Sequence, residues 1–287
     1  MSIEIDIISC INEKYPQLRE AEKKVADVVV NELEFASLAS ISELAAKAEV
    51  SEASVTRFSK ALGCRNIRDL KMRIAKTLVT AQQFIYEKPD ESGVSGIYES
   101  AKNVIQRNRN AISETVLNQV CEIMTNARHI VAVGMGGGST IMSQELQYRL
   151  FRFGLIVTAY NDGLLSRMVA STVEKNDVFF VLSASGSTRE VNEAASIAKQ
   201  YGATVIAITS ENSELARISD FILPIINEEG DFIYKPSTSR YAMLVAIDCL
   251  AYRLAVMNKP KSRDKLRRIK INLDSHRPAA VRQPLGD

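Results

Sequence analysis

The stretch Ile41–Leu62, ISELAAKAEVSEASVTRFSKAL, has the spacing of two short helices joined by a tight turn. Apolar residues in its first half recur at i, i+3, i+4 and i+7, which is one face of a helix: Ile41, Leu44, Ala45 and Ala48. We expect Ser42 to cap this helix and Ser51 to cap the second, because a serine hydroxyl can accept a free first-turn N–H. Gly63 is expected to end the second helix.

The second helix of this pair has an apolar face, formed by Val55, Phe58 and Leu62. Its polar residues stay free to contact another molecule, and we expect them to bind DNA: Ser51, Ser54, Thr56, Arg57 and Lys60. In a helix-turn-helix the second helix lies in the major groove, with its N-terminal residues against base edges. The alternative is a helical hairpin in an ordinary bundle, whose polar residues are only solvated.

The charge distribution favours DNA binding over the plain hairpin. Residues 51–80 contain seven basic and two acidic side chains, whereas residues 1–50 contain five basic and ten acidic ones. The segment is therefore neutral as a whole but strongly polarised along its length. Such a basic face suits contact with phosphates, which supply most of the affinity in DNA binding.

Composition limits the remaining possibilities. With 287 residues, 46% hydrophobic and 24% charged, the chain is expected to be a soluble protein of two domains. No run of 18 apolar residues is present and the N-terminus is acidic, so we expect a cytoplasmic protein that does not engage a membrane. Four widely spaced cysteines and two histidines are too few for a metal site, and we expect reduced thiols, no metal and no cofactor.

From residue 129 onward, short β-branched runs alternate with segments of helical period. The expected strands are 130–133, 155–159, 178–182, 204–208 and 221–225, and the last long helix is 239–257. This alternation predicts an α/β fold with a doubly wound parallel sheet, which binds ligands outside the carboxyl ends of its strands.

Before this region the pattern is helical throughout, with two helices expected within residues 5–35 around Tyr15-Pro16, and others at 68–79, 97–112 and 116–127. The expected domains are a helix-turn-helix DNA-binding domain at 1–80, a linker and connecting helix at 81–115, a ligand-binding domain at 116–258 and a basic tail at 259–287. The charged segment 87–93 breaks the periodicity as a linker does.

Two loops that follow strands are suited to holding a phosphate. In the first, GMGGGST at 134–140, glycines let backbone N–H groups approach an anion, and we expect Gly138 and Ser139 to bind it. A dinucleotide site is the alternative, but the acidic residue it needs is poorly placed at Asp162.

The second loop, SASGSTR at 183–189, contains more hydroxyl groups than a helix cap requires. We expect four of them to surround phosphate oxygens: Ser183, Ser185, Ser187 and Thr188. The plainer interpretation is that one hydroxyl caps the helix and that the others are solvated.

These loops resemble the sugar isomerase (SIS) domain, in which Ser- and Thr-rich loops hold a phosphosugar. With the helix-turn-helix, nearly the whole chain resembles the RpiR family of bacterial transcription regulators. The residues that carry the likeness are Glu22–Ala26, Val50–Phe58, Leu62-Gly63, Leu182–Glu190 and Thr238–Arg240. Phe151–Phe153, Asp231–Tyr234 and Thr238–Arg240 look closest to the branch that regulates hexose and ketogluconate catabolism. The first loop departs from the usual G-x-G-x-S by one extra glycine, so that either Ser139 or the Gly138 amide takes the serine's place.

The resemblance implies a regulator of carbohydrate metabolism, commonly a repressor, in which a phosphorylated sugar controls the affinity for operator DNA. It also implies a homodimer or homotetramer, which would place two recognition helices on a roughly palindromic operator.

An aldose–ketose isomerase is the main alternative, and such an enzyme needs a base and an acid. His129 lies before the first strand, at the end opposite the loops, and His276 lies in the basic tail. Glu190 is better explained as a first-turn carboxylate favoured by the helix dipole. We therefore expect no catalytic residues. A phosphosugar sensor acting through a protein partner is a third possibility.

The tail has Leu266, Ile269 and Leu273 at helical spacing. We expect it to be a solvated amphipathic helix, or else to contact another subunit or DNA.

Overall fold

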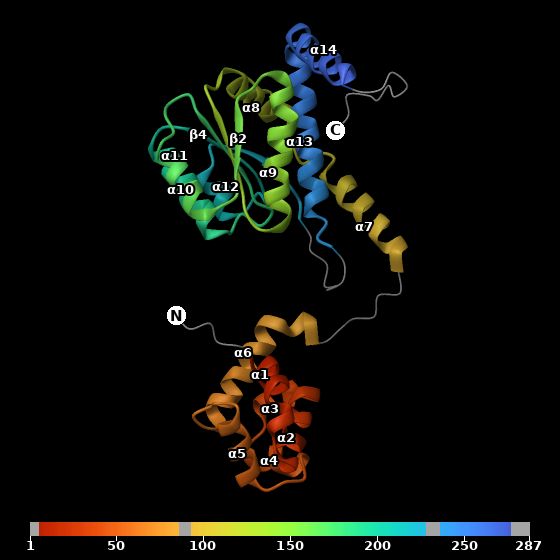
Figure 1. Cartoon of the computed structure of the whole chain (residues 1–287), viewed down its shortest axis with the longest axis vertical. Helices are drawn as coiled ribbons and strands as arrows, with labels where there is room; N and C mark the ends of the chain where they lie inside the picture. Colours follow the sequence, from red (N-terminus) through yellow and green to blue (C-terminus); the bar gives the residue numbers. More distant parts are fainter. Residues whose placement is uncertain (1–5, 86–92, 228–235, 277–287) are drawn as a thin grey trace. The chain divides into compact units, whose positions relative to one another are not determined.

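The computed structural model describes residues 6–85, 93–227 and 236–276, and it divides into two compact units (Figure 1). The first unit is formed by the described residues up to 85, and the second by those from 93 onward. The predicted linker residues 87–92, the segment Asp231–Tyr234 and the tail beyond residue 276 lie outside the described ranges.

The first unit is helical, as predicted. Its elements are α1 (Ile7–Lys14), the 3-10 turn η1 (Tyr15–Gln17), α2 (Glu20–Asn31), α3 (Leu33–Leu38), α4 (Ile41–Lys47), α5 (Glu52–Ala61) and α6 (Ile67–Ile85). The helix α3 was not expected, because six residues are too few to show a helical period and Glu32, at φ −136°, separates it from α2. Buried residues of α1, α2, α5 and α6 form one core, with Phe58 of α5 fully buried at its centre.

The helix pair α4–α5 has the predicted packing. Ala45 is buried between the helices, and Val55, Phe58 and Leu62 face the core. Ser51 caps α5 by accepting a hydrogen bond from the Ser54 N–H at 3.3 Å. The predicted cap of α4 was wrong. Ser40, not Ser42, caps α4, because its hydroxyl accepts from the Glu43 N–H while the Glu43 carboxylate accepts from the Ser40 N–H.

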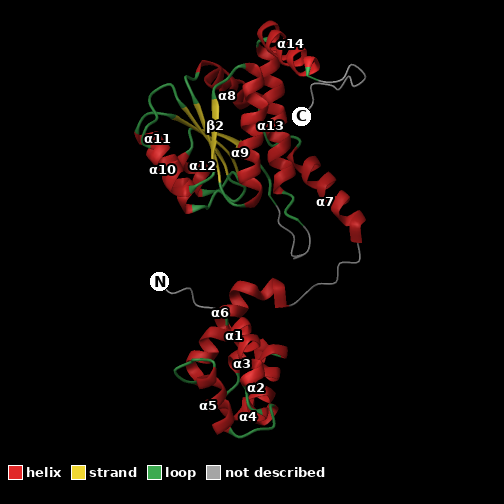
Figure 2. Cartoon of the chain, in the orientation of Figure 1, coloured by secondary structure: helices red, strands yellow, loops and turns green. Residues whose placement is uncertain are grey.

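The second unit is an α/β domain (Figure 2). Its helices are α7 (Gly93–Asn108), α8 (Glu114–Asn126), α9 (Gly137–Leu150), the 3-10 turn η2 (Phe151–Phe153), α10 (Gly163–Ala170), α11 (Arg189–Gln200), α12 (Glu214–Ile218), α13 (Ser239–Met257) and α14 (Lys259–Ser275). Its strands are β1 (Ile130–Gly134), β2 (Val157–Tyr160), β3 (Val178–Leu182), β4 (Thr204–Thr209) and β5 (Phe221–Pro224). All neighbouring strands are parallel, in the order β2-β1-β3-β4-β5.

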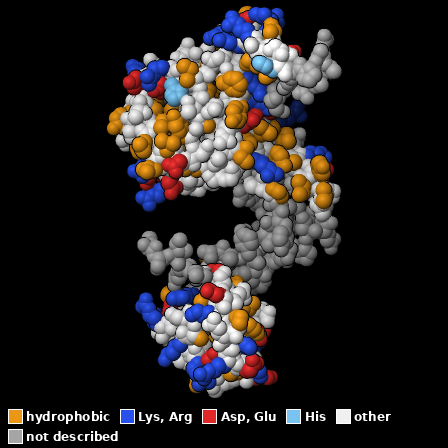
Figure 3. All heavy atoms as spheres, in the orientation of Figure 1, with side chains coloured by type: hydrophobic (Ala, Val, Ile, Leu, Met, Phe, Trp, Pro, Cys, Tyr) orange, Lys and Arg blue, Asp and Glu red, His pale blue; other side chains and the backbone are white. Residues whose placement is uncertain are grey.

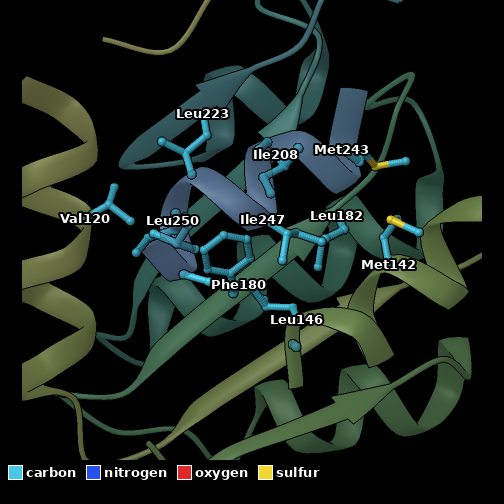
Figure 4. Close-up of a cluster of buried hydrophobic side chains, with 14 of the residues drawn as sticks. Val120, Met142, Leu146, Phe180, Leu182, Ile208, Leu223, Met243, Ile247 and Leu250 are labelled. Carbon is cyan, nitrogen blue, oxygen red and sulfur yellow. The ribbon is translucent and has the colours of Figure 1, made fainter. Parts of the chain in front are cut away.

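Helices cover both faces of this sheet, which confirms the predicted doubly wound fold (Figure 1). On one face α8, α9 and α13 pack over strand side chains that include Phe180, Leu182 and Ile208 (Figure 4). On the other face α10, α11 and α12 cover the alternate side chains, which include Phe179 and Val181. Because side chains alternate along a strand and both faces are buried, the central strands are apolar without interruption.

At the amino-terminal edge of the sheet, a buried carboxylate links the segments that lead into β1 and β3. Asp177, just before β3, accepts two hydrogen bonds from Arg128, at 2.9 Å from Nε and 2.6 Å from Nη2. It also accepts from the Glu174 N–H at 2.9 Å. Burial alone would raise the pKa of Asp177, but the hydrogen bonds from Arg128 and the Glu174 N–H, together with the Arg128 charge, hold the pKa of this carboxyl below its usual value.

The helix α14 is the described part of the basic tail, and its Lys and Arg side chains gather at one end of the unit (Figure 3). It packs beside η2, where Lys265 lies against Gly154. No single helix in the described ranges is long and apolar enough to cross a membrane. The pair α13–α14 meets that test only jointly and bends by 110° at its break.

We predict that Asp177→Asn lowers the free energy of unfolding by about 1–3 kcal/mol at pH 7, because the Arg128 guanidinium and the Glu174 N–H lose a charged acceptor. Since the native pKa is lowered, the carboxylate stabilises the fold above its unfolded pKa of about 4, and this contribution is lost as the pH falls below that value. Urea unfolding at pH 7 and pH 3.5 measures the effect. The control Asp264→Asn, a half-buried carboxylate that pairs with Arg267 and Arg268 of its own helix, should change the free energy of unfolding by less. A difference from wild type that is equally large at both pH values would contradict the assignment.

Candidate functional site

The two predicted loops lie side by side at the carboxyl edge of the sheet. The strands β1 and β3 are hydrogen-bonded neighbours, and Gly134 at the end of β1 is in register with Leu182 at the end of β3. Strand β2 lies on the other side of β1, so the order of the strands reverses at this point. In open α/β sheets, ligands bind in the crevice formed where the strand order reverses.

The first loop turns tightly from β1 into α9. A Cβ at Gly134 would lie 2.1 Å from the Ser139 carbonyl oxygen, so only glycine fits there. Gly136 has φ +75°, and α9 then begins at Gly137. The predicted binding residues Gly138 and Ser139 therefore lie in the first turn of α9, Gly138 half-buried and Ser139 8% exposed.

The second loop, between β3 and α11, is ordered by its own hydroxyl groups. Ser183 is buried, and its Oγ accepts a hydrogen bond from the Gly186 N–H at 3.2 Å. The Ser185 Oγ accepts from the Ser187 N–H at 3.3 Å and from the Ser187 hydroxyl at 2.9 Å. Ser185 and Ser187 are exposed, and Thr188 is half-buried at the N-cap position of α11.

Three helix N-termini at this edge have no side-chain cap among the described residues: those of α9, α11 and α13. The neighbouring helices α10 and α12 are capped by Asp162 and Ser213. Uncapped first-turn N–H groups need an acceptor, and an anion supplies one while also meeting the positive end of the helix dipole. The arrangement is thus suited to a phosphate group.

Contacts between these helix starts bring them together. A Cβ at Gly138 would lie 3.6 Å from the Arg240 Cβ, which places the start of α13 beside the first loop. At the start of α10, a Cβ at Gly163 would lie 3.3 Å from the Glu190 Cβ of α11 and 3.7 Å from the Met135 Sδ. The ends of β1, β2 and β3 and the start of α13 therefore share one edge.

Three further residues support this site and were not among the predicted ones. Asn161 donates from Nδ2 to the Gly134 carbonyl and to the Ser143 hydroxyl, both at 2.7 Å. Asn192 donates to the Gly186 carbonyl at 3.2 Å. Neither asparagine was predicted, because a single asparagine in a sequence does not show which carbonyl or hydroxyl it will bond.

Arg240 is the third of these residues, and its guanidinium is held by the Tyr241 hydroxyl at 3.1 Å. The sequence did carry a signal for it, the Thr238–Arg240 motif. The motif did not reveal that α13 returns to the first loop.

The side chains weighed for isomerase chemistry do not form a catalytic group. His129 lies before β1, at the opposite edge, and its Nε2 pairs with the Thr158 hydroxyl at 3.0 Å. Glu190 is exposed in the first turn of α11. His276 ends α14 as its C-cap residue. Among the residues that the structure describes, no three His, Cys, Asp or Glu side chains are grouped to hold a metal ion.

The predicted DNA-binding residues lie on α5, but they are not all equally accessible. Ser51, Arg57 and Lys60 are exposed, whereas Thr56 is half-buried and donates to the Glu52 carbonyl at 3.1 Å. Ser54 is buried, and its hydroxyl accepts from Arg57 Nη2 at 2.9 Å. The Ser54 side chain therefore positions Arg57 in the free protein, instead of facing solvent itself.

Comparison with known proteins agrees with both units. The model of the helix-turn-helix domain of the rpiR family matches residues 5–81, and the model of the SIS domain matches residues 123–253. A solved structure, the Vibrio vulnificus NanR protein complexed with ManNAc-6P, is similar with a TM-score of 0.59 and 26% identity. That similarity covers 93% of this chain and 98% of that one.

Relatives match over nearly the full chain. The HTH-type transcriptional regulator HexR of Pseudomonas aeruginosa is 32% identical over 93% of this chain and 95% of its own length. HexR of Escherichia coli K12 is 29% identical over 95% of this chain and 96% of its own. These relatives are regulators, which confirms the predicted class over the isomerase alternative. The chain belongs to the rpiR family of helix-turn-helix transcriptional regulators, with a SIS domain as its second unit.

Proposed function

We propose that this regulator binds operator DNA through α5 and that a phosphorylated sugar, bound at the carboxyl edge of the sheet, controls its affinity for the operator. The observation that carries the proposal is the meeting of three uncapped helix starts at the point where the strand order reverses. The similar NanR protein is complexed with ManNAc-6P, which supports a phosphorylated sugar as the class of effector here.

The phosphate would lie between the two loops. The Gly138 amide and the Ser139 hydroxyl would donate from the start of α9, and the hydroxyls of Ser185, Ser187 and Thr188 would donate from the second loop. Ser183 would hold the second loop in shape while facing the same pocket. Arg240 would add a positive charge from the α13 side, where a charge-assisted hydrogen bond is stronger than a neutral one.

The DNA contacts would come from the exposed end and side of α5. Arg57 and Lys60 are exposed cations there, and Ser51 and Thr56 offer hydroxyls near the start of the helix. We propose that Arg57 reads a base edge or a phosphate while Ser54 fixes its direction, and that Lys60 contacts phosphate.

We further propose a homodimer or homotetramer in which two α5 helices occupy half-sites about one helical turn apart, or a multiple of that distance. The DNA-binding domain would be residues 1–80, joined through 81–115 to the ligand domain at 116–258, with the basic tail at 259–287. By linkage, the sugar can change operator affinity only as far as it prefers one subunit arrangement over another. Release of a repressor by the sugar is the direction we propose.

Arg57→Ala should weaken operator binding by about tenfold or more, because it removes a charge-assisted contact, and should lower the salt slope by about one. Fluorescence anisotropy with the upstream region of its own gene, at several salt concentrations, measures both quantities. Lys24→Ala, an exposed cation on α2, is the matched control and should bind as wild type does. Equal loss of phosphosugar binding and of DNA binding would indicate misfolding and contradict the assignment.

Ser183→Ala should leave operator affinity unchanged without ligand but weaken the phosphosugar response by about tenfold, since the second loop loses a hydrogen bond that orders it. Thermal-shift screening of phosphorylated hexoses would first identify an effector, and calorimetry would then compare the variants. Arg240→Gln should give a similar loss without altering the second loop. Ser171→Ala, on an exposed serine that ends α10, is the control. Unchanged sugar affinity in both Ser183→Ala and Arg240→Gln would remove the carboxyl edge as the effector site.

A further inference from the structure

A partly open cavity lies in the SIS unit, away from the two loops of the candidate sugar site. Its volume is about 440 Å³, and it is lined by residues of α7, α8, the end of β5 and α13. Its walls are mainly apolar and include Ile105, Leu117, Ile225 and Val245. None of the loop residues 134–140 or 183–189 lines it. This size and apolar character are those of small-molecule sites, which typically occupy 300–1,000 Å³.

Polar groups at the cavity are few and incompletely paired. Arg253 of α13 and Asn118 of α8 both line it. The Arg253 Nε and the Asn118 Oδ1 are buried, and neither has a hydrogen-bond partner among the described residues. A buried donor or acceptor without a partner destabilises the protein, so a ligand that pairs with them would bind more tightly than its apolar contacts alone allow.

The charged side chains at the cavity determine which charge a ligand must carry to bind there. Two guanidinium groups, from Arg109 and Arg253, line it together with one carboxylate, from Glu114. A guanidinium donates in a planar fork that matches a carboxylate. The apolar walls in turn need an apolar body. A small carboxylate with an aromatic or aliphatic body satisfies both requirements.

Hydrogen bonds hold the wall of the cavity in place on its α7 side. Asn108, in the last turn of α7, donates from Nδ2 to the Ile226 carbonyl at 3.0 Å and accepts from the Ile226 N–H at 2.8 Å. This pair of hydrogen bonds ties the end of α7 to the chain that leaves β5. Because the wall is anchored at this point, the cavity does not depend on a loosely packed helix end.

We propose that this cavity is a second ligand site, which takes a small amphipathic carboxylate and pairs it with Arg253. It is independent of the sugar site and of DNA binding, and it can be tested by direct binding.

The chain contains no tryptophan, so the fluorescence of a single introduced tryptophan reports only on its own surroundings. Tyr252 lines the cavity and is 71% exposed, so Tyr252→Trp places the sole indole at its rim. Titration of the full-length variant with 3-phenylpropanoate should change the emission saturably, with a Kd below about 1 mM. Acetate, which lacks the apolar body, and 3-phenylpropylammonium, which has the opposite charge, should each bind at least about tenfold more weakly.

In the Tyr252→Trp background, Arg253→Gln should weaken 3-phenylpropanoate binding about tenfold or more, because the ligand loses its charged partner. Arg263→Gln, an exposed arginine of α14 outside the cavity, is the matched control and should bind as the parent variant does. A midpoint of thermal unfolding equal to that of the Tyr252→Trp parent shows that the fold of each variant is intact.

Three results would overturn the proposal. The first is the absence of saturable binding, and the second is equal binding of the carboxylate and the ammonium probe. The third is an emission spectrum that depends on protein concentration and not on the probe. Exposed apolar side chains gather over α7 (Figure 3), and these include Val94, Tyr98 and Ile105. Such a spectrum would show that a second copy of the chain, and not a small molecule, covers this side of the unit.

Discussion

The pairing of β1 with β3 is the constraint on which the candidate ligand site depends. Parallel pairing puts the carboxyl ends of both strands at one edge, and the register of Gly134 with Leu182 sets the two loops at the same level. Neither loop could form a site alone, because each supplies only one helix start. The glycine at position 134 then allows the turn, since any side chain would collide with the Ser139 carbonyl.

Helix capping differs between the two kinds of helix start in this unit. Asp162 and Ser213 close the N-termini of α10 and α12 with their own side chains. Among the described residues, no side chain caps α9, α11 or α13 at the candidate site. At α9 the residue type explains this, since Gly136 has no side chain to accept a hydrogen bond, whereas the Thr188 and Thr238 hydroxyls at α11 and α13 could cap but do not.

Much of this organisation could be predicted from the sequence. The α13 boundaries, the buried face of α5 and the five parallel strands follow from periodicity, which is strong in long or fully buried elements. The short helix α3 and the Ser40 cap could not be predicted, because each depends on one or two backbone angles or on competition between neighbouring serines.

In the candidate ligand site, residue type was enough to predict the hydroxyl-rich and glycine-rich loops. Contacts between segments that are distant in sequence could not be predicted in this way. The Asn161 bridge and the approach of Arg240 to Gly138 depend on how the sheet brings separate strands and helices together. The burial of Ser54 was hidden for a similar reason, since a serine on a polar face gives no sign that it turns inward.

The burial of the Ser54 side chain has a thermodynamic consequence for Arg57. The hydroxyls of Ser51 and Ser54 lie 3.1 Å apart, and Ser54 holds the Arg57 guanidinium before any partner arrives. A free arginine side chain loses rotamer entropy when it is immobilised at an interface, at a cost of about 0.5–1.5 kcal/mol. In the proposed contact of Arg57 with DNA, an arginine that Ser54 already holds would lose less of that freedom, so more of its interaction energy would remain as affinity.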